Sequence, residues 1–341
     1  MGQTWRASAD GAVEVARRLA DDVLFPAAVA TDAADAVPGG HLDLLADSGL
    51  YGLVGSAAHG GLAAGAELVG SVIEALAGGC LATTFVWAQH HGLVRKLEAA
   101  SPSPERDGWL RLACRGERRA GLALGGVLPG DARLRAAPLG HGDGWSVDGT
   151  SPWVSGWGLV DVLLVAARGP NDTLVWLVVD AAEGPGLSVH RHRLVAVDAS
   201  VTVRVDFHRL VVPGERVVAA EAYSEARYNR PEVLRQNGFL ALGVAGRCCR
   251  LLGPSAFDDD LVACRLRLRE AGEEGIAAAR AAASDLALRA ASAAVVAAGS
   301  GGIVRHTHPE RLAREALFLL VFGTRPAIQA SLLKQLGGPA R

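Results

Sequence analysis

One segment near the middle of the chain carries the most specific pattern in the sequence. Residues 144–168 read GWSVDGTSPWVSGWGLVDVLLVAAR. Residues 145–147 are predicted to form a short strand closed by Asp148-Gly149, because Asp-Gly favours a two-residue hairpin turn. A second short run, 153–155, follows, and the apolar run 160–167 predicts a buried strand. A Trp-Val-Ser-Gly-Trp sequence at a hairpin end is unusual, since large exposed aromatic side chains rarely lie free of a partner.

Composition sets broad limits on the rest of the chain. The 341 residues are half hydrophobic and 21% charged, which is enough for a large core and two or three domains. A formal net charge of -2 gives no positive surface typical of nucleic-acid or membrane binding. The five cysteines lack metal-site spacing, so we expect a reducing compartment without disulfides. Because no apolar signal core or membrane span is evident, the sequence predicts a soluble, cytoplasmic protein.

The pattern of apolar residues changes twice along the chain. Helical spacing predicts helices at residues 13–24, ending at Pro26, and at 41–48, 66–77 and 81–99. Short strands and turns follow from 119 to 218, and a Greek-key-like barrel fits them. Further helices are predicted at 239–252, 261–270, 273–298, 310–322 and 326–336.

The string G-W-x-V-x-G-x-x-x-W-V-S-G-x-x-x-x-D resembles the middle β-domain of the acyl-CoA dehydrogenase family. A Gly-Gly loop after His59 and the segment Val-Pro-Gly-Glu at 212–215 extend the resemblance over nearly the whole chain. It implies an α+β fold with an N-terminal helical domain (1–118), a middle β-barrel domain (119–218) and a C-terminal four-helix-bundle-like domain (219–341). It also implies a homodimer or homotetramer packed through the bundle.

The resemblance further implies FAD as cofactor. Trp153 would pack on the isoalloxazine, and the Ser155 hydroxyl and nearby backbone amides such as that of Val154 would hydrogen-bond it. The cofactor-binding positions carried over from the family are Trp153, Val154, Ser155, Gly125, Gly301, Gly302 and Thr324. Gly301 and Gly302 match a turn that contacts the dinucleotide, although a helix C-cap with a tight turn explains them equally well.

Other parts of the expected FAD site are missing. The loop that usually bonds the flavin pyrimidine edge is replaced by residues 123–131, which contain Gly125 but no hydroxyl side chain. The Arg-x-x-Phe-Gly segment that holds the neighbouring subunit's FAD diphosphate is not recognisable after Gly253. Three aspartates, 258–260, stand there instead, and Asp258 is predicted to be a helix N-cap. FMN or a reduced flavin is therefore the alternative cofactor.

The family's usual catalytic base is also absent. In most members this base is the Glu of a Y-E-G-T motif, and the matching position here is Phe322, before the retained Gly-Thr pair. A phenyl ring cannot abstract a proton. Glu315, Glu232 and His91 are weak candidates for a relocated base, and an ion-paired or solvated helix residue is the favoured interpretation of each. His306, His308 and Glu310 predict a polar loop rather than a metal site.

These features leave three hypotheses for function. The first is a flavoprotein oxidoreductase acting on CH-CH groups of a CoA-bound or carrier-protein-bound acyl thioester, with an electron-transfer flavoprotein as a partner. The second is a reduced-flavin-dependent monooxygenase on the same fold, served by a flavin reductase, which needs no base at residue 322. The third is a non-redox scaffold or subunit that has lost flavin chemistry.

Overall fold

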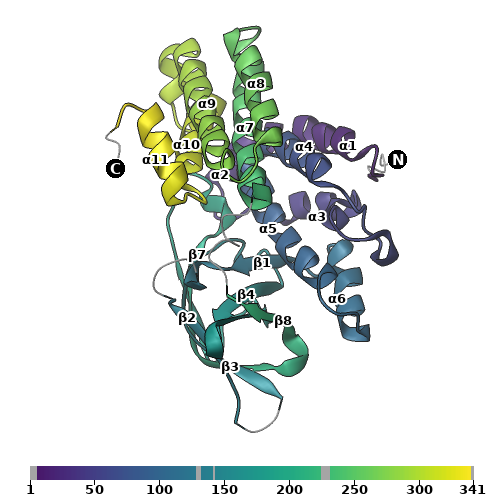
Figure 1. Ribbon diagram of the computed structural model, residues 1–341. Coiled ribbons are helices and arrows are strands. Elements are labelled where there is room, and N and C mark those ends of the chain that lie inside the picture. Colours follow the sequence, from purple (N-terminus) through teal and green to yellow (C-terminus); the bar gives the residue numbers. More distant parts are fainter. Residues whose placement is uncertain (1–5, 128–131, 141–142, 224–230, 339–341) are drawn as a thin grey trace.

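Helices precede and follow the strands along the chain. The computed structural model describes residues 6–127, 132–140, 143–223 and 231–338. In Figure 1 the strands lie below the helices, and the helices from the two ends of the chain lie beside each other. The expected α+β architecture of N-terminal helices, middle strands and C-terminal helices is confirmed.

The N-terminal helices end before the first strand. They are α1 (Ala12–Arg18), α2 (Phe25–Ala33), α3 (Gly39–Asp47), α4 (Ala66–Ala77), α5 (Leu81–Glu98) and α6 (Pro104–Cys114). Amphipathic α4 buries Val69, Val72, Ile73 and Leu76 toward the core, whereas α5 is buried along almost its entire length. Helix α5 therefore lies between the other N-terminal helices and the sheet.

The predicted helix end at Pro26 is wrong. A π-helical segment, Leu19–Leu24, connects α1 to α2, and Pro26 occupies the first turn of α2. A proline in a regular helix removes an N–H donor and its ring clashes with the carbonyl four residues earlier. The wider π turn just before Pro26 carries the chain past it, so the helical path continues to Ala33.

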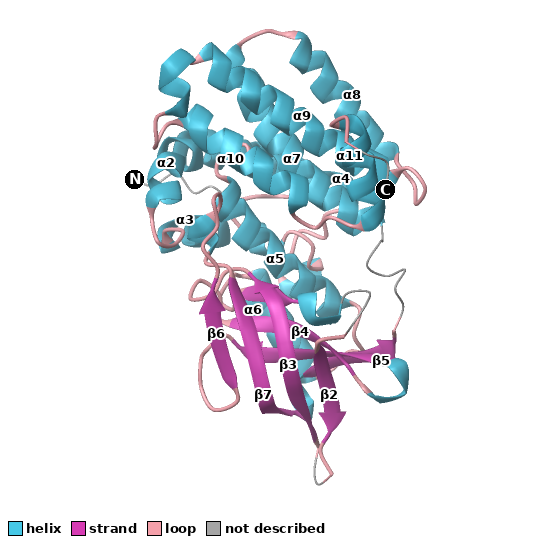
Figure 2. Cartoon of the chain, turned by 90° about the vertical axis from the view of Figure 1, so that its left-hand side faces the viewer, coloured by secondary structure: helices cyan, strands magenta, loops and turns pink. Residues whose placement is uncertain are grey.

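Eight strands form one sheet. They are β1 (Ala120–Ala123), β2 (Leu134–Pro138), β3 (Gly144–Val154), β4 (Val162–Arg168), β5 (Thr173–Asp180), β6 (Leu187–Arg191), β7 (Val203–Pro213) and β8 (Val217–Ala222). The order is β6-β7-β3-β2-β4-β5-β8, and β1 pairs with β4 in parallel. Figure 2 shows β6, β7, β3 and β2 side by side, crossing β4 and β5. The wholly apolar run of β4 is buried on both faces, as its sequence predicts.

The predicted hairpin at Asp148-Gly149 is wrong. Strand β3 runs without a turn through both residues, and its register against β7 shifts between Val147 and Gly149. Gly149 has a φ of 118°, and an added Cβ would lie 1.9 Å from the Arg133 carbonyl oxygen. Asp148-Gly149 therefore forms a β-bulge. Glycine adopts a positive φ in a bulge as readily as in a hairpin turn, so the Asp-Gly pair is compatible with both.

The C-terminal helices pack around α9. They are α7 (Pro231–Leu252), α8 (Ala256–Glu270), α9 (Ile276–Ala297), α10 (His308–Val321) and α11 (Pro326–Gln335). Helix α9 contacts the other four, and its many alanines allow close approach. The N-cap of α8 is Ser255 and not Asp258, which instead supplies the second half of a capping box.

The last strand of the sheet is longer than expected. Strand β8 continues to Ala222, past the boundary expected after residue 218, because it pairs with β5. The domain boundaries themselves stay predictions. No helix within the described ranges is long and apolar enough to cross a membrane.

His90 on α5 joins the N-terminal helices to the first strand. Its Nδ1 accepts a hydrogen bond from the Ala120 N–H at 3.1 Å, and its Nε2–H donates to the Ala113 carbonyl at 3.1 Å. A proton on Nδ1 would face the Ala120 N–H, so these contacts select the neutral ring. Burial lowers the pKa of His90 to about 3.

We expect acid to destabilise the fold through His90. Its pKa in the folded state lies below the ordinary value of 6.5, so the unfolded chain binds more protons below pH 6.5. Stability is therefore lost as pH falls from 6.5 toward 3. Between pH 7 and pH 5 the wild type should lose about 2 kcal/mol more than His90→Gln, whose side chain does not titrate. Urea unfolding of both proteins at both pH values measures this; equal losses would contradict it.

Candidate functional site

The end of β3 presents an exposed indole. Trp153 is 58% exposed, although it is one of the largest apolar side chains in the protein. One face of its ring stacks on His192, with centroids 4.3 Å apart and planes 28° from parallel. His192 is oriented by its own Nε2–H, which donates to the Pro152 carbonyl at 2.8 Å. Val154 is buried and pairs with Val203 of β7, so the strand holds the indole outward.

A short chain of hydroxyl groups begins at Ser155, two residues after this indole. The Ser155 and Thr202 hydroxyl oxygens are 2.8 Å apart, and those of Thr202 and Ser200 are 3.0 Å apart. Either oxygen of each pair can donate, and when Thr202 donates to Ser155 the Ser155 proton is free. Ser200 is fully buried, whereas Ser155 is 8% exposed. The Ser155 end can therefore donate a hydrogen bond to a bound molecule.

The backbone next to this hydroxyl chain is strained. Val197 and Val201 have φ values of 52° and 46°, a region that β-branched residues rarely adopt. The Gly156 N–H donates to the Ser200 carbonyl at 2.7 Å, which ties the strained loop to the end of β3. Strain of this kind costs on the order of 1–3 kcal/mol per residue and concentrates at functional sites.

Phe322 belongs to a cluster of three phenyl rings. It is the C-cap of α10, edge-on to Phe85 of α5 at 4.7 Å and stacked on Phe318 at 5.3 Å. Helix α5, which carries Phe85, also meets the segment after Ser155, because Gly156 lies next to Val86. The position expected to hold a base is thus apolar, and its phenyl ring is held by two others.

A buried arginine fixes the turn that carries Phe322. The Arg280 Nη2 donates to the Leu319 and Phe322 carbonyls at 3.1 and 3.3 Å. Burial lowers the pKa of Arg280 to about 10, so the group is still charged at neutral pH. Carbonyls at a helix C-terminus favour a cation there. Thr324, in the retained Gly-Thr pair, donates its hydroxyl to the Leu320 carbonyl at 3.0 Å.

The three weak candidates for a base lie elsewhere. Glu315 is 2% exposed and accepts a hydrogen bond from Arg311 at 2.5 Å. Glu232 is exposed in the first turn of α7. His91 is buried edge-on to Trp87 at 4.5 Å. Within the described residues, none of the three makes a hydrogen bond, ion pair or ring contact with the phenyl cluster.

The glycines carried over from the family occupy two places. An added Cβ at Gly125 would lie 3.0 Å from Pro152, so this residue is next to the Trp153 segment; residues 128–131 of its loop are outside the described ranges. Gly301 is exposed with open space around it. Gly302 is buried, and an added Cβ would lie 2.5 Å from the Val295 carbonyl, which makes it a requirement of the tight turn.

The first turn of α10 contains His308 and Glu310, so the predicted polar loop is wrong for these two residues. His308 stacks on Phe25 at 3.9 Å, and desolvation lowers its pKa to about 4. Glu310 forms an ion pair with Arg314. Across the described residues no group of three or more His, Cys, Asp and Glu side chains could hold a metal ion.

Sequence reasoning missed three residues at this site. Phe85 lies within an apolar helical run in which nothing distinguishes it from a core residue. Thr202 belongs to an alternating strand pattern, and only its polar side chain beside valines could have singled it out. His192 reaches Trp153 through tertiary structure alone.

The N-terminal part of the chain matches a known family model. The model described as acyl-CoA dehydrogenase, N-terminal domain, matches residues 9–117. The chain is therefore similar to this family in its N-terminal helices, and its fold is that of solved acyl-CoA dehydrogenases.

The proteins to which this chain is similar are named for different reactions. The chain is 24% identical to 3-sulfinopropanoyl-CoA desulfinase of Paraburkholderia xenovorans (strain LB400), over 95% of this chain and 94% of that protein. Butyryl-CoA dehydrogenase from Megasphaera elsdenii has the same fold, with a TM-score of 0.82, 16% identity and 99% of each chain covered. Dibenzothiophene monooxygenase from Paenibacillus sp. A11-2 has a TM-score of 0.76, 19% identity and coverage of 96% and 98%.

Proposed function

We propose that this protein is a flavin-dependent oxidoreductase acting on an acyl thioester, by a reaction that does not use residue 322 as a base. The observation that carries the proposal is the exposed Trp153 indole, followed two residues later by the Ser155 hydroxyl. A planar aromatic heterocycle stacks on an indole, and a hydroxyl at its edge gives it orientation. We therefore propose that Trp153 and Ser155 receive a flavin ring.

The residues present fit a flavin ring better than a whole dinucleotide. Trp153 would support the ring, and Ser155 would donate a hydrogen bond to its polar edge. Gly125 lies against Pro152, the residue before Trp153. A bound flavin would supply the two-electron redox step. FAD is the family's usual cofactor, and FMN or a reduced flavin fits the same two side chains.

The phenyl cluster argues against ordinary dehydrogenation. Removal of the α-proton of a thioester needs a base within hydrogen-bond reach. Phe322, Phe85 and Phe318 give an apolar, aromatic surface instead. The desulfinase to which this chain is similar is named for a reaction other than desaturation, so the similarity does not require a dehydrogenase. The substrate class we propose is a thioester of CoA or of a carrier protein.

A reduced-flavin-dependent monooxygenase is the second candidate. Two observations favour it: the loss of the base at Phe322 and the shared fold with a dibenzothiophene monooxygenase. A dehydrogenase would pass electrons to an electron-transfer flavoprotein, whereas a monooxygenase would receive reduced flavin from a reductase. We propose a homodimer or homotetramer in either case.

An absorbance spectrum of the purified protein, before and after adding FAD, tests the proposal. A saturable flavin band near 450 nm supports both flavin-dependent functions. Anaerobic bleaching by an acyl-CoA selects an oxidoreductase that takes electrons from the thioester, and substrate-dependent oxygen uptake with reduced flavin selects the monooxygenase. A colourless protein that binds no FAD, FMN or reduced flavin contradicts both and leaves the non-redox scaffold.

We expect Trp153→Ala to weaken flavin binding about 10- to 100-fold, because stacking on an aromatic side chain contributes about 1–3 kcal/mol per base. Trp153→Phe keeps a ring and should stay within about threefold of the wild type. Quenching of flavin fluorescence in a titration measures both affinities. Wild-type affinity in Trp153→Ala would place the flavin elsewhere.

A further inference from the structure

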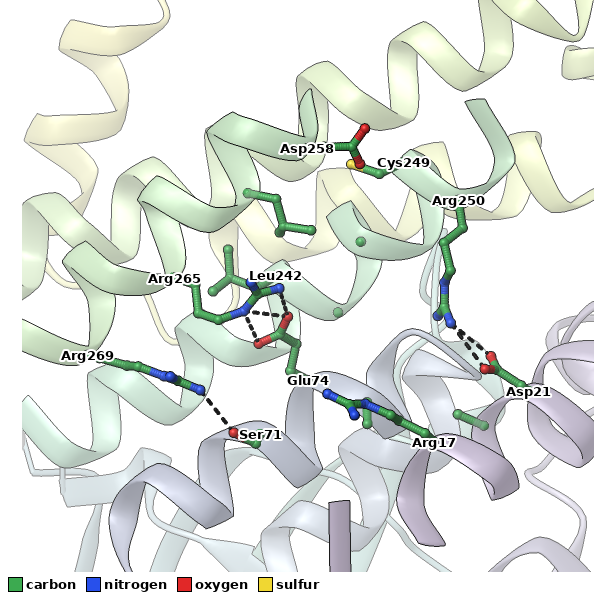
Figure 3. A pocket seen from close by; sticks show the side chains of 15 residues that line it. Arg17, Asp21, Ser71, Glu74, Leu242, Cys249, Arg250, Asp258, Arg265 and Arg269 are labelled. Carbon is green, nitrogen blue, oxygen red and sulfur yellow. Dashed lines mark hydrogen bonds and ion pairs between the residues drawn. The ribbon is translucent and has the colours of Figure 1, made fainter. Parts of the chain in front are cut away.

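A cavity lies away from Trp153, where the N-terminal helices meet the C-terminal bundle. It has a volume of about 490 Å³ and is bounded by α1, α4, α7 and α8 (Figure 3). Pockets that bind small molecules usually measure about 300–1,000 Å³. The cavity therefore has room for a small metabolite and is too small for a folded partner.

Small and apolar residues form the base of this cavity. Ala75 of α4 and Leu242, Gly243 and Gly246 of α7 contribute to it. Gly243 is needed for helix packing, because an added Cβ would lie 2.4 Å from the Glu74 carbonyl oxygen. At Gly246 an added Cβ meets only Leu261, at an ordinary 3.4 Å. Gly246 thus leaves open volume that the fold itself does not require.

The carboxylates at the cavity are all engaged. The Glu74 carboxylate accepts hydrogen bonds from the Nε and Nη2 groups of Arg265 at 3.1 and 2.6 Å. Asp258 accepts the Ser255 N–H as part of the α8 capping box. Asp21 is shared between two arginines, 247 and 250. One carboxylate cannot neutralise two guanidinium groups, so this pair retains an excess positive charge.

Two further arginines have unused donors. Arg17 of α1 lines the cavity, and within the described residues its side chain has no hydrogen-bond or ion-pair partner. Figure 3 shows it reaching in beside Glu74 with no dashed contact. Arg269 of α8 bonds Ser71 and Glu67, but its buried Nε has no partner among the described atoms. An unpaired buried donor is costly unless something fills the position.

We propose that this cavity binds a small phosphate-bearing anion, held by Arg17, Arg250 and Arg269. These guanidinium groups come from three helices, and all three arginines line the cavity. A planar guanidinium matches phosphate geometry with two parallel N–H donors. The Ser71 hydroxyl adds a further donor, and the apolar base accepts the uncharged part of the ligand. Binding would join α1 and α4 to α7 and α8.

Calorimetric titration of the full-length protein with inorganic pyrophosphate tests this proposal, with inorganic phosphate, succinate and sodium chloride as parallel titrants at constant ionic strength. We expect saturable pyrophosphate binding and a melting temperature raised by about 4 °C at a hundredfold excess over the Kd. No saturable binding, an equal effect of chloride, or tighter binding of succinate would overturn the assignment to a phosphate-bearing ligand.

Two variants locate the ligand. Arg17→Gln removes the unpaired guanidinium and should weaken binding at least tenfold. Gly246→Leu fills the cavity from its base and should abolish binding while leaving the melting temperature of the free protein within a few degrees. Arg18→Gln is the matched control, since Arg18 pairs with Glu14 and does not line the cavity. Wild-type affinity in both Arg17→Gln and Gly246→Leu would also overturn the proposal.

Discussion

Glu315→Gln should lower the free energy of unfolding by about 3–5 kcal/mol, the cost of breaking a buried ion pair. The Glu315 carboxylate and the Arg311 guanidinium are 3% and 1% exposed and 2.5 Å apart. The Nε and Nη2 atoms of Arg311 have no other partner among the described residues. Neutralising Glu315 therefore leaves a buried cation without its counter-charge. Urea unfolding at pH 7 measures the loss.

A double variant distinguishes two roles of Glu315, as a partner in a buried ion pair and as a catalytic base. Arg311→Met with Glu315→Leu removes both charges and should restore stability to within about 1–2 kcal/mol of the wild type, because buried pairs are often replaceable by apolar residues. Glu310→Gln on the same helix breaks a more exposed pair and should cost about 1 kcal/mol or less. A stable double variant that keeps full activity would exclude Glu315 as a base. Equal small losses in all three proteins would contradict the expected energetics.

Phe322→Glu should increase anaerobic flavin bleaching by an acyl-CoA at least about 100-fold, if the family's proton abstraction is blocked here only by this residue. A positioned base contributes about 10²–10⁴-fold to such a step. The backbone that would carry the new carboxylate is already fixed, since Arg280 holds the Phe322 carbonyl and Gly323 has a φ of 62°. The rate is measured on protein reconstituted with FAD.

Matched variants make this experiment decisive. Phe322→Gln has nearly the same shape without a basic oxygen and should show no increase. Phe318→Glu places a carboxylate one turn earlier in the same phenyl cluster and should also show none. A Phe322→Glu protein that behaves like Phe322→Gln would mean that substrate or flavin positioning, rather than the missing base, distinguishes this protein from a dehydrogenase.

Local sequence patterns predicted most helices and strands. They did not predict the local structure where one signal, such as a proline or an Asp-Gly pair, is compatible with two structures. The apolar run of β4 and the helix α4 were predictable because burial imposes their periodicity. Pro26 and Asp148-Gly149 misled because each signal has two structural uses, and the choice depends on neighbours. At Pro26 a π turn precedes the proline, and the helical path continues. At Asp148-Gly149 the chain forms a bulge, because β7 pairs with β3 both before and after these two residues.

The candidate site was predictable only where one segment carries it. Trp153 and Ser155 lie in a single motif, so the sequence shows them directly. His192, Thr202 and Phe85 reach the same place from other elements, by contacts that a single sequence does not encode locally. Their contribution follows from packing and hydrogen bonding, which only the folded chain displays.

The contact between Arg280 and the end of α10 also bears on the order of folding. Arg280 lies on α9, 39 residues before Leu319, and its guanidinium bonds the last carbonyls of α10 from inside the bundle. Helix α10 can form early from local interactions, but the turn after it cannot acquire its final shape until α9 has docked. The surface around residue 322 is thus a late product of assembly.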